Sequence, residues 1–240
     1  MVTFWLAIRA IIYYIILFIT SLIWFSAILL TRPFSKTAVY CIIASWSRQA
    51  AWWCKVICGL SYEIEGAENF NKVPAIFFVK HQSAWETFTL AGILPCSVFV
   101  VKRSLLMIPF VGWGMAFAKY IAINRKAGHS AFKYVLNQGA EHLKQGHSIV
   151  IFPEGTRVAP KTYPEFHKSG AALAKATGYP VIPIAHNAGS FWKRRAFIKK
   201  PGTIKMIVGE PIPTKNGVST EQLRNMTHSW MQKQMKKIEQ

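Results

Sequence analysis

The sequence predicts an α/β protein in which a mixed sheet is flanked by helices and preceded by an N-terminal membrane-embedded helical segment. From Ser61 onward, short apolar segments alternate with longer helical ones, as in proteins that build a sheet from successive strand–helix units. Residues 10–31 carry no charge and are long enough to cross a bilayer core. Only 16% of residues are charged and 52% are hydrophobic, which excludes a disordered chain.

The first membrane helix is expected over residues 10–31, with the sequence AIIYYIILFITSLIWFSAILLT. A second helical candidate covers residues 37–60 and carries Arg48 and Lys55 beside tryptophans of the kind found at membrane interfaces. It fits a second span, a helix lying in the interface, or one arm of a hairpin embedded in one leaflet. We therefore expect membrane helices over residues 1–60 and an α/β domain over residues 61–240. Positive residues after the first segment favour the inner membrane, with the rest of the protein facing the cytoplasm.

The α/β part is expected to contain seven strands separated by helices and turns. The strands are expected at Tyr62–Glu65, Ala75–Lys80, Ser97–Val101, Tyr120–Asn124, Ser148–Phe152, Val181–Ala185 and Thr203–Val208. Helices are expected to open at Thr87 and to cover His129–Gln145, Glu165–Thr177 and Thr220–Ile238.

The formal net charge of +19 implies an anionic binding partner or substrate: nucleic acid, an acidic membrane surface or phosphorylated substrates. The uncharged segment and the lack of a nucleic-acid-binding motif favour membrane and substrate over nucleic acid. A basic and aromatic patch is expected at Lys193-Arg194-Arg195 and Lys199-Lys200, beside Phe191 and Trp192. It fits either a solvated surface or a surface that contacts acidic headgroups.

The four cysteines, at positions 41, 54, 58 and 96, show neither metal nor redox spacing, and we expect reduced, buried thiols. No pair of histidines or cysteines has the spacing of metal ligands, so neither a metal nor another cofactor is expected.

The candidate catalytic pair is His81 and Glu86, which follow the apolar strand segment that ends near Val79. Within one continuous helix, a five-residue offset would place the two side chains roughly 140° apart. They can meet only if His81 stays in the loop and Glu86 lies in the first helical turn. Glu86 would then accept a hydrogen bond from one imidazole nitrogen, and the other would be free to take a proton from a substrate hydroxyl.

A structural alternative accounts for the same carboxylate. Ser83-x-x-Glu86 is also a capping box, in which Glu86 returns to the backbone at the helix start. In this alternative, His81 is an ordinary polar residue at the end of a strand.

Two arginines follow other predicted strands: Arg125 after Ile123-Asn124, and Arg157 in the segment Phe152-Pro153-Glu154-Gly155-Thr156-Arg157. An arginine in such a position can bind a phosphate through paired hydrogen bonds, or it can form a surface ion pair. Gly155 allows positive φ or a close approach of backbone to ligand. Lys102 adds a cation after the third strand.

These segments together resemble the glycerolipid acyltransferase superfamily. The signature of that family is a histidine, four residues and an aspartate, here His81 and Glu86. The FPEGTR block at residues 152–157 is its most specific second mark, and Ile123-Asn124-Arg125 and Val181-Ile182-Pro183-Ile184 fit its other two blocks. The resemblance covers roughly residues 73–213 and is greatest to members that acylate lysophosphatidic acid.

The resemblance implies a fold of this family and transfer of an acyl group from acyl-CoA or acyl-carrier protein to the sn-2 hydroxyl of lysophosphatidic acid. It also implies His81 as base and Glu86 as its orienting partner. Substrate would be bound by Arg125, Arg157 and Lys102, together with Glu154, Gly155 and Thr156, at an anionic membrane. Backbone N–H groups near Gly155 are expected to stabilise the oxyanion. No G-x-S-x-G elbow occurs, so direct transfer is expected.

The departure from the family pattern is Glu86, where the family has Asp. Glutamate is the only acidic residue type in this chain, which favours a tolerated substitution. Three other interpretations remain open: an acyltransferase with another acceptor (glycerol-3-phosphate, another lysolipid or an acyl-amino-acid lipid), a lysolipid or thioester hydrolase, and a catalytically weakened membrane protein.

Overall fold

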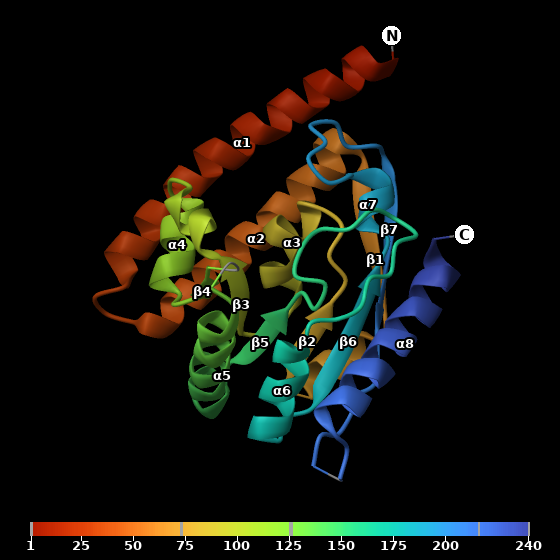
Figure 1. Ribbon diagram of the computed structural model, residues 1–240. Helices are drawn as coiled ribbons and strands as arrows, with labels where there is room; N and C mark the ends of the chain where they lie inside the picture. The colour runs from red at the N-terminus through yellow and green to blue at the C-terminus, as the bar shows by residue number, and fades with distance from the viewer. Residues whose placement is uncertain (1, 73, 125–126, 216, 240) are drawn as a thin grey trace.

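The computed structural model describes residues 2–72, 74–124, 127–215 and 217–239, and its described strands form one seven-stranded sheet (Figure 1). The strands are β1 (Leu60–Glu65), β2 (Ile76–Val79), β3 (Ser97–Lys102), β4 (Ile121–Ile123), β5 (Ser148–Ile151), β6 (Val181–His186) and β7 (Gly202–Val208). All seven strands predicted from the sequence are confirmed, each to within two residues at its ends.

The spatial order of the strands is β1-β7-β6-β2-β5-β3-β4. β2 pairs in parallel with both β5 and β6, and β3 pairs in parallel with β5 and β4. β7 runs antiparallel to β6, and β1 is parallel to β7, so the sheet is mixed as expected. Five strands, β2 to β6, therefore end at the same edge of the sheet, where α/β proteins place their sites.

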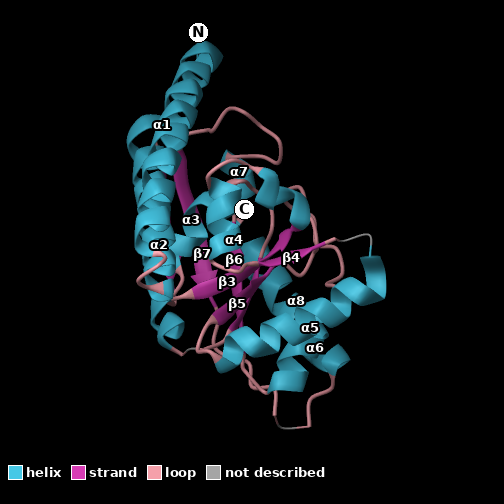
Figure 2. Ribbon diagram, turned by 90° about the vertical axis from the view of Figure 1, so that its left-hand side faces the viewer, coloured by secondary structure: helices cyan, strands magenta, loops and turns pink. Residues whose placement is uncertain are grey.

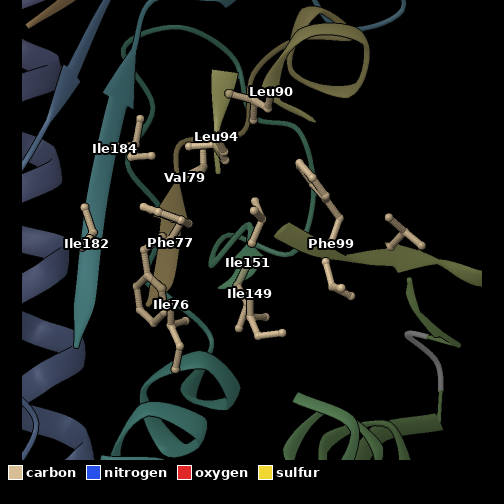
Figure 3. Packing of buried hydrophobic residues seen from close by; sticks show 14 of the residues in the cluster. Ile76, Phe77, Val79, Leu90, Leu94, Phe99, Ile149, Ile151, Ile182 and Ile184 are labelled. Atoms are coloured by element: carbon tan, nitrogen blue, oxygen red, sulfur yellow. The ribbon is translucent and has the colours of Figure 1, made fainter. Parts of the chain in front are cut away.

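The core lies on both faces of the central strands. β2, β5 and β6 are buried along their whole length, because their continuous apolar sequences leave no polar face for solvent. Figure 3 shows Ile76, Phe77, Ile149 and Ile182 among these packed side chains. The strand that leads to His81 is consequently held rigidly in the middle of the sheet.

Helices cover both faces. They are α1 (Val2–Thr31), α2 (Lys36–Cys58), α3 (Trp85–Ile93), α4 (Val111–Phe117), α5 (Gly128–Lys144), α6 (Lys168–Thr177), α7 (Ala188–Phe191) and α8 (Thr220–Ile238), with short 3-10 helices η1 (Ala67–Asn71) and η2 (Arg103–Met107). Figure 2 shows α2 and α3 on one side of the sheet and α5, α6 and α8 on the other. α4, α7 and the 3-10 helices were not predicted, because each is too short to show a period in sequence.

The first two helices form a hairpin that packs on the α/β part (Figure 1). α1 is the one helix in the described part of the chain that is long and apolar enough to cross a membrane. α2 does not meet this criterion, and it packs on α3, where the Ser47 hydroxyl donates to the Phe88 carbonyl at 2.8 Å. The second arm of the hairpin is thus held by the α/β part of the molecule.

Two predictions about individual side chains were wrong. Lys199 does not belong to a basic surface: it is 1% exposed, and its Nζ lies 3.4 Å from the centre of the Tyr14 ring and 4.6 Å from that of Trp192. Aromatic faces attract a cation that has lost its water, so Lys199 ties α1 to the segment before β7. Among the cysteines, all free, Cys54 and Cys58 are buried as expected but Cys41 and Cys96 are exposed.

Phe77→Ala should destabilise the protein, because it opens a cavity beside the central strand where Phe77 is fully buried. The expected loss is about 3–5 kcal/mol in the free energy of unfolding, measured by denaturant titration in detergent. Met226→Ala, at a half-exposed position on α8, is the matched control and should change stability little. Equal effects of the two substitutions would contradict this account of the core.

Candidate active site

The site begins where β2 ends. Lys80 to Ala84 form the loop to α3, which starts at Trp85 and carries Glu86 in its first turn. His81 therefore lies in the loop and Glu86 in the first helical turn, which is the only arrangement in which the two were predicted to meet. Glu86 Oε2 is hydrogen bonded to Nδ1 of His81.

The other oxygen of the same carboxylate performs the capping role. Glu86 Oε1 accepts the backbone N–H groups of Gln82 at 2.7 Å and Ser83 at 2.6 Å. The catalytic and structural alternatives are thus not exclusive, because one oxygen holds the loop and the other holds the imidazole.

Glu86 is fully buried, yet its charged form is stabilised. Burial by itself opposes ionisation, but His81, His186 and the N–H of Gln82 together lower the pKa of Glu86 below its ordinary value. His186 Nε2 lies 3.5 Å from Glu86 Oε1 and donates to the Lys80 carbonyl at 2.8 Å. Burial lowers the pKa of His186, and the neighbouring Glu86 carboxylate opposes that shift.

His81 is held by its backbone as well as by its ring. Its N–H donates to Glu154 Oε2 at 2.9 Å, and its carbonyl accepts the N–H of Val158 at 2.8 Å. The ring stacks on Phe152 with centroids 4.1 Å apart. Because Glu86 accepts the Nδ1 proton, Nε2 is left with its lone pair, and it has no hydrogen-bond partner among the described residues.

Glu154 belongs to this support, although the sequence placed it among residues that bind substrate. Its carboxylate accepts from Lys80 Nζ at 2.6 Å and from the His81 N–H, and both Lys80 and Glu154 are buried. Burial raises the pKa of Glu154 to about 7, and the neighbouring Lys80 opposes that rise. Glu154 therefore holds the backbone of His81 in place, and its contact with substrate stays a prediction.

Gly155 adopts positive φ, at +69°, which confirms one of the two reasons proposed for a glycine at this position. A Cβ there would lie 2.6 Å from Nε2 of His167, so a side chain has no room. The N–H of Gly155 donates to the Phe152 carbonyl at 2.9 Å and cannot bind an oxyanion at the same time. Thr156, next in the turn, is exposed.

Arg157 and Lys102 line the same cleft as His81. Arg157 donates from Nη2 to Thr87 Oγ1 at 3.1 Å, while its Nε is buried with no partner among the described residues. Neither cation forms an ion pair with a described residue, so for Arg157 the surface ion pair is not what the structure shows. Arg125 lies outside the described residues, and its role stays a prediction.

The cleft has a volume of about 890 Å³, including space open to solvent, and its walls are mostly apolar. α1 and α2 contribute side chains such as Phe25 and Trp46. The η2–α4 segment (residues 103–117) contributes Leu105, Phe110 and Met115. An apolar cleft with a few converging polar groups is the usual form of a small-molecule site.

Four residues around His81 were missed by the sequence analysis as parts of the site: Lys80, Gln82, His186 and Glu239. Each is buried and polar, and each contacts the His81 loop or a residue that supports it. Lys80 and Gln82 flank His81 in the sequence, which was a weak indication that they belong to the site. No sequence pattern near His186 or Glu239 indicated a role for either residue.

In the described part of the chain, no three His, Cys, Asp or Glu side chains are grouped so that they could hold a metal ion.

An acyltransferase family model matches residues 61–187. Over 236 residues, the chain is 36% identical to the 1-acyl-sn-glycerol-3-phosphate acyltransferase of Pseudomonas aeruginosa, covering 97% of this chain and 92% of that protein. It is 32% identical over 168 residues to the Saccharomyces cerevisiae protein of the same name, covering 68% of this chain and 55% of that protein.

The fold is similar to the crystal structure of the 1-acyl-sn-glycerophosphate acyltransferase PlsC from Thermotoga maritima. The TM-score is 0.81 at 22% identity, covering 96% of this chain and 94% of that chain. At this identity, the likeness supports the fold alone.

Glu154→Gln should change how stability depends on pH. Because the pKa of Glu154 is raised to about 7 from 4.5, the folded chain holds a proton in this interval that the unfolded chain releases. Wild-type stability relative to the variant should therefore rise as pH is lowered from about 7 to about 4.5, by up to about 1.4 kcal/mol per pH unit. Denaturant titrations across this range would measure it, and a constant difference would contradict the assignment.

Proposed function

The chain belongs to the acyltransferase family, and from that premise we propose that it transfers a fatty acyl group from acyl-CoA or acyl-carrier protein to the sn-2 hydroxyl of lysophosphatidic acid, forming phosphatidic acid for phospholipid synthesis. The observation that carries the proposal is that Nε2 of His81 has no hydrogen-bond partner among the described residues and faces an apolar cleft. The same cleft contains Arg157 and Lys102, and neither forms an ion pair with a described residue.

In the proposed reaction, His81 Nε2 takes the proton of the acceptor hydroxyl as its oxygen attacks the thioester carbonyl carbon. A carbon–oxygen bond forms, the carbon–sulfur bond then breaks, and the imidazolium returns its proton to the leaving thiolate. Atoms and charge balance without a covalent enzyme intermediate. The buried Glu86 carboxylate holds the Nδ1 proton and stabilises the imidazolium, which is the usual role of a carboxylate behind a histidine base.

We assign recognition of the acceptor phosphate to Arg157 and Lys102, with Arg125 as a further predicted contact. A buried Nε–H without a partner, as in Arg157, costs free energy unless a ligand accepts from it. A phosphate oxygen is a suitable acceptor for an arginine fork. Thr156 and the backbone of Gly155 lie in the same turn as Arg157 and are further proposed substrate contacts. Glu154 holds the backbone N–H of His81.

We assign the apolar part of the cleft to acyl chain. Each CH₂ moved from water into such a cleft contributes about 0.8 kcal/mol, so the walls from α1, α2 and α4 would bind a long chain strongly. The reacting carbonyl or hydroxyl would then lie near His81.

We propose that residues 1–60 attach residues 61–240 to the inner membrane, with the active site on the cytoplasmic side. α1 is 30 residues long, and only 22% of its most apolar window is buried inside the molecule. Figure 1 shows this helix along the outside of the fold. A helix so exposed and so apolar favours lipid contact over water.

The η2–α4 segment (residues 103–117) extends this apolar surface. Met107 is 80% exposed, and Ile108 and Trp113 are also exposed. The ring of Phe110 packs on Phe18 of α1 with centroids 5.9 Å apart, which makes the two surfaces continuous.

Cations border the η2–α4 segment, and acids do not. Lys102 directly precedes it, Arg103 is its first residue and Lys119 follows it, and no acidic residue occurs between Glu86 and Glu141. An apolar surface with a basic border fits an anionic bilayer.

The reaction is tested by adding lysophosphatidic acid and either acyl-CoA or acyl-carrier protein thioester, in separate arms, to membranes that contain the protein. Phosphatidic acid should form with at least one donor. His81→Ala should lower kcat on the order of 10²–10⁴-fold because the base is lost, whereas His129→Ala, an exposed histidine, should not. If the wild type forms no phosphatidic acid with either donor, the proposed reaction is refuted. If the His81→Ala variant is as active as wild type, the role of His81 as base is refuted.

The η2–α4 segment should lie at lipid depth. In a chain with Cys41 and Cys96 replaced by serine, a polarity-sensitive fluorophore on Met107→Cys should shift to the blue in anionic vesicles and be quenched by nitroxide lipids. The same label on Met226→Cys, on α8, should remain in water. Equal spectra at the two positions would show that the segment stays out of the bilayer.

A further inference from the structure

Glu239 lies directly after α8, at the C-terminal end of the helix, where the helix dipole disfavours a carboxylate. The C-terminal end of a helix carries partial negative charge, and Glu239 is its cap residue. The side chain is 7% exposed and forms no ion pair with a described residue. A buried charge of this kind persists only if other donors satisfy it.

Three donors do so, and they come from two separate segments of the active-site edge. Glu239 Oε1 accepts from Gln82 Nε2 at 2.7 Å. Oε2 accepts from the backbone N–H of Lys161 and from the Tyr163 hydroxyl, both at 3.0 Å. All three hydrogen bonds that this carboxylate accepts from described residues lead to the His81 loop and to the segment after the FPEGTR turn.

The first contact leads to the catalytic pair through Gln82. This residue is fully buried, and its backbone N–H donates to Glu86 Oε1 at 2.7 Å. Its side-chain oxygen accepts the Gly189 N–H at 3.3 Å. A Cβ added to Gly189 would lie only 2.8 Å from the Cβ of Gln82, so this close approach requires glycine. Gln82 is thus fixed at both ends, with its side chain on Glu239 and its backbone on the carboxylate that orients His81.

The second contact supports a turn with unfavourable backbone geometry. Lys161 has φ of +60°, a conformation that a residue with a side chain seldom adopts without external support. The next residue, Thr162, accepts from Lys80 Nζ at 2.9 Å, and Lys80 in turn pairs with Glu154 behind His81. The Lys161 turn is therefore part of the same support, reached from the opposite side.

We propose that Glu239 is a positioning residue for the acyl transfer: it fixes Gln82 and the Lys161 turn, and through them the orientation of Glu86 and His81. The inference rests on the proposed function for its kinetic consequences but not for its structural ones. It assigns to the end of α8 a role in catalysis although Glu239 is 157 positions from Gln82 in the chain.

The test compares Glu239→Ala and Glu239→Gln with wild type. In Glu239→Ala, kcat should fall on the order of 10- to 100-fold, because small errors in catalytic geometry are costly, while KM for both substrates changes less than about two-fold. Glu239→Gln keeps one acceptor oxygen, so its kcat should lie between those of wild type and Glu239→Ala. The control is Glu221→Gln, on the same helix but exposed, which should match wild type.

A double-mutant cycle and hydrogen exchange separate positioning from simple loss of stability. If Glu239 acts through Gln82, the Gln82→Ala/Glu239→Ala double variant should be no slower than the slower single variant. Amide exchange should increase at residues 82–86 and 161–163 in Glu239→Ala and not in Glu221→Gln.

Unchanged kcat in both Glu239 variants, unchanged exchange at these amides, or multiplicative effects in the cycle would each overturn the proposal. If Glu239→Ala does not fold, Glu239→Gln decides by the same criteria. A wild type without acyltransferase activity would refute the proposed function, whereas the exchange comparison would still decide the role of Glu239.

Discussion

The structure around the site depends on one constraint: the buried carboxylate of Glu86 must keep all of its hydrogen-bond donors. Burial opposes its charge, and among the described residues the hydrogen bonds from His81 and from the N–H groups of Gln82 and Ser83, with His186 3.5 Å away, offset that penalty. The helix start, the loop and the imidazole are therefore coupled through a single group. One oxygen of Glu86 accepts N–H groups of the loop before α3, while the other is hydrogen bonded to the ring.

A second layer of buried polar groups holds that arrangement in place. Lys80 and Glu154 fix the backbone of His81, and Glu239 fixes Gln82 and the turn at Lys161. Buried ion pairs contribute little net stability, because desolvation offsets their attraction. Their value here is geometric, since each group has a defined partner and leaves His81 few alternative positions.

The cleft joins this polar site to the apolar surface of the first helices. Apolar side chains of α1, α2 and the η2–α4 segment form its walls, and the same segments expose other apolar side chains outward. Lys199, enclosed by aromatic rings of α1 and of the segment before β7, ties the first helix to the sheet. The proposed lipid chemistry and the proposed membrane attachment thus use one continuous set of elements.

The sequence alone determined what local pattern controls. Apolar segments placed all seven strands, because side-chain burial in a strand depends on neighbours in the chain. The five-residue spacing of His81 and Glu86 required a loop and a first helical turn, and Gly155 signalled positive φ. Tertiary structure decided that Lys199 is buried, that Glu154 supports His81, and that Glu239 meets Gln82. These contacts join residues distant in sequence, and only packing of the sheet and helices brings them within hydrogen-bonding distance.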